Sequence, residues 1–178
     1  MKTNKLSNKD RVLQISMAGL IAALYVALTY LAMSLGLDKN AIQIRFSEAL
    51  CALAFVTPAA VPGITVGCFI ANLLTGCAPL DIFLGPIATL IGAMGAYLCG
   101  KLKNKRIAKW LWSIPNILAN TVIVTIVCYF CYTAPGEQTL AIIPFYATTI
   151  FIGEVISCGV LGTILLVSAE KPLRRILQ

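Results

Sequence analysis

The sequence lacks histidine and is poor in charged side chains. Its 178 residues include no histidine, seven acidic and 14 basic residues, so only 12% carry a charge. Without histidine, the chain has neither the commonest metal ligand nor the commonest general base, and we expect neither a metal site nor a catalytic site. Soluble domains of ordinary composition carry about 25% charged residues, so the low charged fraction argues against a soluble fold.

Two further kinds of chemistry are missing from the sequence. No stretch fits G-x-x-x-x-G-K-[ST], so the chain has no P-loop with which to bind and hydrolyse ATP. The seven cysteines are scattered through apolar runs, where cysteine behaves as a small apolar residue. Cys128 and Cys131 have a redox-like spacing but not the βαβ context that gives this motif its meaning. We therefore expect no cofactor bound by this chain.

Apolar sequence is abundant. Hydrophobic residues make up 59% of the chain, and the mean hydropathy is +0.88. This composition predicts one integral membrane domain, an all-α bundle of six transmembrane helices. The expected spans cover about residues 12–35, 42–56, 64–75, 80–99, 115–132 and 142–168. The second and third are short, so they either cross fully or form a hairpin that enters and returns on the same side.

The basic residues predict the orientation of these spans. They gather in three clusters, at residues 2–11, 101–109 and 171–175. Six crossings place all three clusters on one side, and positively charged loops mark the cytoplasmic side. Both termini are therefore expected in the cytoplasm. Trp110 and Trp112 follow the middle cluster, where aromatic residues mark the membrane interface.

Polar side chains gather in the outer half of the predicted bundle. The candidate ligand-binding residues are Gln43, Arg45, Glu48, Asn72, Asp81, Asn120 and Glu154. Each charge inside a membrane costs about 3 kcal/mol and needs a partner or a ligand. Arg45 and Glu48 share one face if their segment is helical. Arg45 then either pairs with Glu48 or Asp81 to lock helices together, or meets a ligand.

The remaining polar residues carry different expectations. No basic residue is near Glu154 in the sequence, so a ligand that donates hydrogen bonds explains this carboxylate best. Asn72 and Asn120 either contact a ligand or bond neighbouring helices. A carboxylate can accept two parallel bonds from a guanine-like edge, and nearby aromatic rings could stack on such a base. These rings are Phe46, Phe83, Tyr129, Phe145 and Tyr146.

Small residues line the first span at intervals of four. They are Ala18, Gly19, Ala22, Ala23 and Ala27. This spacing lets a second helix approach closely in a membrane. The second helix belongs either to this chain or to a separate membrane partner.

Several short motifs follow one another along the chain. They are residues 44–50 (IRFSEAL), 57–63 (TPAAVPG), 67–72 (GCFIAN), 80–85 (LDIFLG), 88–90 (ATL), Pro115-Asn116 with Asn120, and 152–154 (IGE). Together they resemble the QueT family, substrate-binding S components of energy-coupling-factor (ECF) transporters. The match covers about residues 40–160 in order. The small-residue face of the first span also resembles the motif by which S components dock on their coupling subunit.

The resemblance implies a protein of the bacterial plasma membrane that takes up a queuosine precursor, a 7-deazaguanine such as preQ1. It also implies a transmembrane coupling subunit and two cytoplasmic ATPase subunits as partners, which would use the ATP. Other hypotheses remain: an S component for another vitamin, or a stand-alone proton-coupled carrier. An intramembrane enzyme is disfavoured because no metal cluster or nucleophile and base pair is evident.

Overall fold

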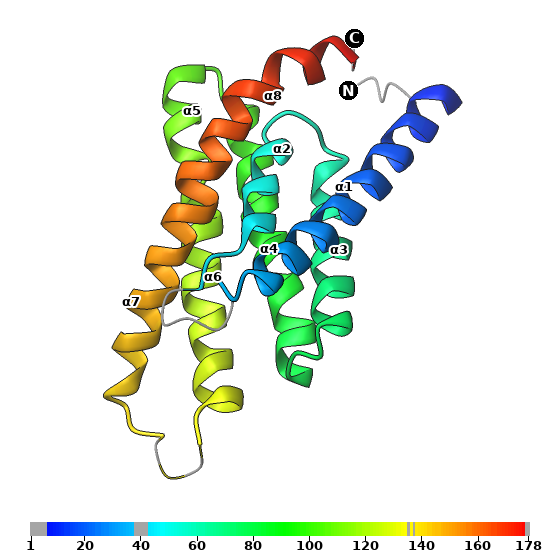
Figure 1. The fold of residues 1–178 in the computed structure, drawn as a ribbon. Helices are drawn as coiled ribbons and strands as arrows, with labels where there is room; N and C mark the ends of the chain where they lie inside the picture. The colour runs from blue at the N-terminus through cyan, green and yellow to red at the C-terminus, as the bar shows by residue number, and fades with distance from the viewer. Residues whose placement is uncertain (1–6, 38–42, 135, 137, 177–178) are drawn as a thin grey trace.

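The chain folds into a bundle of helices (Figure 1). The computed structural model describes residues 7–37, 43–134, 136 and 138–176, and no strand occurs within these ranges. The elements are α1 (Asn8–Ser34), a 3₁₀ helix (Phe46–Leu50), α2 (Cys51–Ala54), α3 (Ala60–Leu74), α4 (Pro79–Gly100), α5 (Lys105–Leu111), α6 (Ile114–Val127), a π-helical turn (Cys128–Tyr132), α7 (Ile142–Glu154), a π-helical segment (Val155–Leu161) and α8 (Gly162–Ile176). The predicted all-α class is confirmed.

Four helical segments in the described part are long and apolar enough to cross a membrane. They are Asn8–Ser34, Pro79–Gly100, Lys105–Tyr132 and Ile142–Arg175. The last one joins α7, the π-helical segment and α8 into one continuous helix. A fifth apolar helix, Ala60–Leu74, is shorter.

The second expected span, residues 42–56, differs most from the structure. Residue 42 lies outside the described residues, and residues 43–45 are not helical. Only Phe46–Leu50 and Cys51–Ala54 are helical, and the first of these is a 3₁₀ helix. This segment is too short to cross a hydrocarbon core of about 30 Å alone.

The basic segment 101–109, expected as a loop, is partly helical. Asn104 caps α5, because its Oδ1 accepts hydrogen bonds from the main-chain N–H groups of Arg106 and Ile107. The expectation for the tryptophans is half right. Trp110 is 80% exposed, whereas Trp112 is fully buried in the core.

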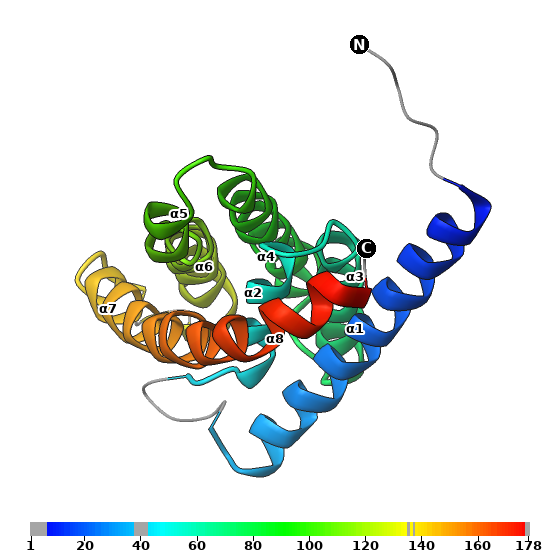
Figure 2. The ribbon, with the colours of Figure 1, turned by 90° about the horizontal axis from the view of Figure 1, so that it is seen from above.

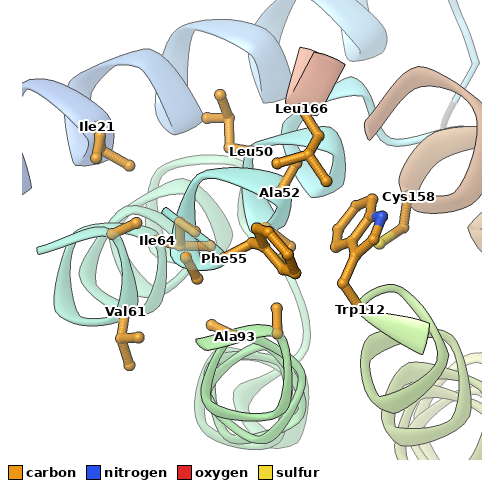
Figure 3. Packing of buried hydrophobic residues seen from close by; sticks show 14 of the residues in the cluster. Ile21, Leu50, Ala52, Phe55, Val61, Ile64, Ala93, Trp112, Cys158 and Leu166 are labelled. Atoms are coloured by element: carbon orange, nitrogen blue, oxygen red, sulfur yellow. The ribbon is translucent and has the colours of Figure 1, made fainter. Parts of the chain in front are cut away.

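The core packs around Trp112. In Figure 3 the Trp112 ring lies near Cys158 and is turned towards Phe55. Leu166 and Leu50 lie above these two rings in the view. A Cβ on Gly162 would come within 2.6 Å of the Trp112 ring. The glycine thus lets α8 approach the indole closely.

Helices α1 and α3 pack through small residues. A Cβ on Gly63 would lie 2.7 Å from the Ala18 carbonyl oxygen. A Cβ on Gly67 would lie 2.7 Å from the Cβ of Tyr25 and 3.0 Å from the Cα of Ala22. The Ala18 and Ala22 face of α1 is therefore used inside this chain, as close helix packing in a membrane requires.

The described parts of the three basic clusters lie at one end of the bundle. Helix α1 begins there, α5 lies there and α8 ends there (Figure 1). At this end, Glu170 of α8 pairs with Lys109 of α5 at 2.5 Å and with Arg174 at 3.3 Å. The last turns of α8 cross towards α1 (Figure 2), and Leu173 borders an apolar hollow with Leu20 and Leu24.

The contact between α1 and α3 gives a first prediction. We expect Gly67→Ala to lower the free energy of unfolding by about 1–3 kcal/mol, because the added methyl group overpacks against Tyr25. Gly19→Ala is the matched control, since nothing lies within 4 Å of its added Cβ and alanine favours a helix by about 1 kcal/mol over glycine. Thermal unfolding of the purified protein in detergent measures both. Equal stability of the two variants would contradict the packing.

Candidate ligand-binding site

Three cavities meet at Arg45, towards the end of the bundle opposite the basic clusters. The largest, of about 290 Å³, is lined by Gln43, Arg45, Cys77, Asp81, Val124, Cys128, Tyr132 and Tyr146. A second, of about 220 Å³, is lined by Thr29, Ala32, Met33, Arg45, Asn72, Thr75 and Cys77. A small one, of about 10 Å³, is lined by Gln43, Arg45, Val124, Ile150 and Glu154. Arg45 lines all three.

The backbone around Arg45 explains this position. Arg45 is extended, with φ −108° and ψ 100°, and comes directly before the 3₁₀ helix. Its N–H donates to the Ser157 Oγ at 3.1 Å. A Cβ on Gly153 of α7 would overlap the Gln43 carbonyl oxygen. Because glycine has no side chain, the extended segment that contains Gln43 can lie directly against α7.

The expected helical face shared by Arg45 and Glu48 is wrong. Arg45 precedes the helix, and its side chain lines the cavities, whereas Glu48 is buried to 1% exposure and lines none of the three. In the described part of the chain, no ion pair joins Arg45 to Glu48 or to Asp81. The guanidinium group therefore faces the cavities without a salt bridge.

Asp81 occupies the first turn of α4, where a carboxylate suits the positive end of the helix dipole. Its Oδ2 accepts a hydrogen bond from the Tyr132 hydroxyl at 3.2 Å, and that hydroxyl accepts one from the Ala78 N–H at 3.0 Å. The Asn72 Nδ2 donates to the Asp81 main-chain oxygen at 3.0 Å. Asp81 is 2% exposed, and its Oδ1 is buried with no hydrogen-bond partner. This oxygen therefore lacks the hydrogen-bond partner that buried polar atoms usually have.

Glu154 is not the isolated carboxylate that its sequence position indicates. Its Oε2 accepts a hydrogen bond from the Asn116 Nδ2 at 3.2 Å. The same nitrogen donates to the Glu48 Oε2 at 3.2 Å, and the Tyr25 hydroxyl donates to the Glu48 Oε1. Two buried carboxylates thus share one amide. Of the two, only Glu154 lines one of the three cavities.

Asn120 belongs to the helix rather than to the cavities. Its Nδ2 donates to the Asn116 main-chain oxygen at 3.2 Å, one turn earlier in α6. It is 3% exposed and lines none of the three cavities. Asn72, by contrast, bonds the main chain of another helix and also lines the 220 Å³ cavity.

The sequence interpretation missed Asn116 and Tyr132 as site residues. Asn116 stands one turn before Asn120 in the same apolar run. A polar side chain in an apolar run is the signal that led to Asn120, and it applies equally to Asn116. Tyr132 ends the fifth expected span, and nothing in its spacing distinguishes it from other interfacial aromatics. Of the aromatic residues expected to stack, Tyr146 lines the 290 Å³ cavity, whereas Phe83 and Phe145 are 65% and 54% exposed.

The small residues of α1 divide between two faces. Ala18 and Ala22 lie against α3, as described above. Gly19, Ala23 and Ala27 are exposed, and no atom lies within 4 Å of a Cβ placed on Gly19. Ala18 and Ala22 thus fit packing within this chain. Gly19, Ala23 and Ala27, on another face of the helix, leave room for a separate partner.

Comparison with known proteins gives two matches. The family model described as QueT transporter matches residues 15–171. A curated relative, the queuosine precursor transporter QueT of Lactococcus lactis subsp. cremoris (strain MG1363), is 31% identical over 97 residues. The match covers 54% of this chain and 57% of the relative, a little over half the length of each. No solved structure matches the chain.

The Asn116 amide that donates to both Glu48 and Glu154 gives a second prediction. We expect Asn116→Leu to lower the free energy of unfolding by about 1–3 kcal/mol, because both carboxylates lose a buried hydrogen-bond donor. Asn120→Leu is the control, since it removes one bond to a main-chain oxygen of its own helix. Thermal unfolding in detergent compares the two. A larger loss at Asn120 would show that Asn116 does not hold the carboxylates.

Proposed function

Because the chain belongs to the QueT transporter family, we propose that it is the substrate-binding subunit of an ECF importer. In this proposal it sits in the bacterial plasma membrane and captures a queuosine precursor, a 7-deazaguanine such as preQ1, from outside. The name of the Lactococcus lactis relative supports the substrate class. The single observation that carries the proposal is that Arg45, which forms no salt bridge within the described residues, lines three cavities, two of which are also lined by Asp81 or Glu154.

The proposed arrangement in the membrane places both termini in the cytoplasm. The clustering of basic residues at one end of the bundle supports this orientation. Helix α3 and the Phe46–Ala54 segment then complete a six-element bundle as its shorter members, within a single membrane domain. The cavities at Arg45 open towards the outside.

The chemistry of the cavity residues suits an aminomethyl deazaguanine. Glu154 offers an acceptor for the parallel N–H groups of a guanine-like edge. Asp81 lines the 290 Å³ cavity, and its carboxylate can pair with a protonated amine. Tyr132 and Tyr146 line the same cavity as Asp81 and can stack on a planar ring. Gln43, Arg45 and Asn72 supply further polar contacts.

The net charge of the site favours a cationic ligand. Three carboxylates, those of Glu48, Asp81 and Glu154, are buried near one guanidinium group, that of Arg45. Intramembrane charges are costly unless they are balanced. A ligand cation balances one of them. Glu48 and Asn120 support the site from behind and need not touch the ligand.

Energy for transport would come from partners. The sequence has no P-loop, so ATP would be bound by two ATPase subunits joined to a transmembrane coupling subunit. The exposed face of α1, formed by Gly19, Ala23 and Ala27, suits close approach by a helix of the coupling subunit.

A proton-coupled carrier is the second candidate, and one observation favours it. Two buried carboxylates that share one amide, Glu48 and Glu154, can hold a proton between them. Such a carrier would need no partner and no ATP. The transport experiment below distinguishes the two candidates.

The proposed site predicts the ligand and the residues that hold it. We expect purified protein to bind preQ1 and to bind thiamin and riboflavin far more weakly. Asp81→Asn and Glu154→Gln should each weaken preQ1 binding about 10- to 100-fold, because each removes a charged hydrogen-bond acceptor. Glu170→Gln is the matched control at the opposite end of the bundle.

Isothermal titration calorimetry in detergent measures these affinities. Binding of thiamin or riboflavin without binding of preQ1 would overturn the substrate. Unchanged preQ1 binding in both Asp81→Asn and Glu154→Gln would overturn the site.

The docking face predicts a variant that separates binding from transport. We expect Ala23→Trp to block assembly with the coupling subunit and abolish ATP-dependent uptake, while preQ1 binding persists, because a large ring prevents close helix approach. Val122→Trp, on the exposed side of α6, should retain assembly and uptake. Co-purification and uptake into vesicles measure these effects. Uptake by the chain alone, without partners or ATP, would favour the proton-coupled carrier.

A further inference from the structure

A buried chain of hydrogen bonds runs from the cavity residue Glu154 to helix α1. Glu154 at the end of α7 accepts from the Asn116 Nδ2, and the same nitrogen donates to Glu48, each at 3.2 Å. Glu48 in the 3₁₀ helix accepts in turn from the Tyr25 hydroxyl on α1. All four side chains are buried, with exposed fractions of 7% or less. The chain therefore runs through the interior of the bundle and reaches a cavity at Glu154.

The side-chain amide nitrogen at the centre of this chain has no N–H group to spare. An asparagine amide nitrogen has two N–H groups, and the Asn116 Nδ2 donates to two carboxylates. Its Oδ1 accepts from the Cys51 thiol at 3.4 Å. A turn of the amide towards one carboxylate therefore weakens its bond to the other.

The packing around the chain also leaves little room. A Cβ on Gly92 would overlap the side chain of Asn116, and a Cβ on Gly67 would lie 2.7 Å from the Cβ of Tyr25. Close-packed interiors respond to a displacement by shifting as a unit rather than by absorbing it. A change at Glu154 is thus transmitted to its neighbours.

We propose that this chain couples ligand binding at Glu154 to helix α1. Asn116 and Glu48 are positioning residues that orient the Glu154 carboxylate, and Tyr25 connects them to α1. The inference rests on the proposed function in one respect, namely that the ligand binds at Glu154.

The coupling has a direct consequence for the partner. Tyr25 is buried on the inner side of α1, while Ala23 and Ala27 are exposed on the same helix. Coupling between two sites is reciprocal in free energy. A partner that docks on the exposed face and shifts α1 therefore changes the affinity at Glu154 by the same factor by which the ligand changes docking.

The first test needs no ligand. The thermal unfolding midpoint is measured in detergent for Tyr25→Phe, Glu154→Gln and the double variant. Tyr25→Phe removes only the hydroxyl group. Because the two residues are joined through Asn116 and Glu48, we expect the double variant to shift the midpoint by less than the sum of the single shifts.

Tyr30→Phe provides the matched control on the same helix. The Tyr30 hydroxyl donates to the Leu74 carbonyl oxygen at 3.3 Å, outside the chain of hydrogen bonds. Its effect should add to that of Glu154→Gln. Additive effects in both pairs would overturn the proposal.

The second test uses preQ1 as the probe in the full chain. Tyr25 lines none of the three cavities, yet we expect Tyr25→Phe to raise the Kd for preQ1 by about fivefold or more. Tyr30→Phe should leave the Kd unchanged. In an Asn116→Leu background, Tyr25→Phe should have no further effect, because the connection is already broken. A merely structural role for Tyr25 would give the same fold-change in both backgrounds.

The outcomes separate this proposal from the proposed function. If the wild-type protein binds preQ1 and Tyr25→Phe binds it equally well, the coupling is wrong and the function stands. If the wild-type protein does not bind preQ1, the substrate is wrong, and the unfolding midpoints alone decide whether Tyr25 and Glu154 are coupled.

Discussion

The hydrogen bonds around the Glu48 carboxylate are the interaction on which this bundle depends. A carboxylate buried among apolar helices is costly unless donors from neighbouring elements satisfy it. Tyr25 of α1 and Asn116 of α6 supply those donors. Gly67 of α3 leaves room for Tyr25, and Gly92 of α4 leaves room for Asn116. The short 3₁₀ helix that carries Glu48 is thereby held between α1 and α6, and the Arg45 segment that precedes it is fixed in position.

The position of Arg45 follows from this anchoring and explains the site. The main-chain bond to Ser157 and the close approach to Gly153 hold the extended segment against the long helix α7–α8. The Arg45 side chain is then directed to the place where three cavities meet. Arg45, which has no salt bridge within the described residues, lines the 290 Å³ cavity together with Asp81, whose Oδ1 is buried without a hydrogen-bond partner. Charges inside a membrane protein are costly unless a partner or a ligand balances them.

The sequence predicted the helices better than the contacts between them. Long apolar runs predicted the helical class, and four of the six expected spans correspond to long apolar helices in the described part of the chain, because length and hydropathy depend on local composition. The prediction of a helix over residues 43–45 was wrong, because the composition of this segment does not show that Arg45 is extended and bonds Ser157. Glu154 looked isolated for a similar reason, since its partner Asn116 is 38 residues away. Five of the seven predicted site residues line at least one of the three cavities, namely Gln43, Arg45, Asn72, Asp81 and Glu154. Glu48 and Asn120 line none of them. Which polar residue faces a cavity depends on helix rotation, and spacing alone does not determine it.

A structure of the protein with bound preQ1, determined by cryo-electron microscopy or crystallography, tests the central claim most directly. We expect the base between Arg45, Asp81 and Glu154, with its edge bonded to the Glu154 carboxylate and its ammonium group near the Asp81 carboxylate. Density for the ligand at any other place, or at this place with neither carboxylate in contact, would contradict the claim.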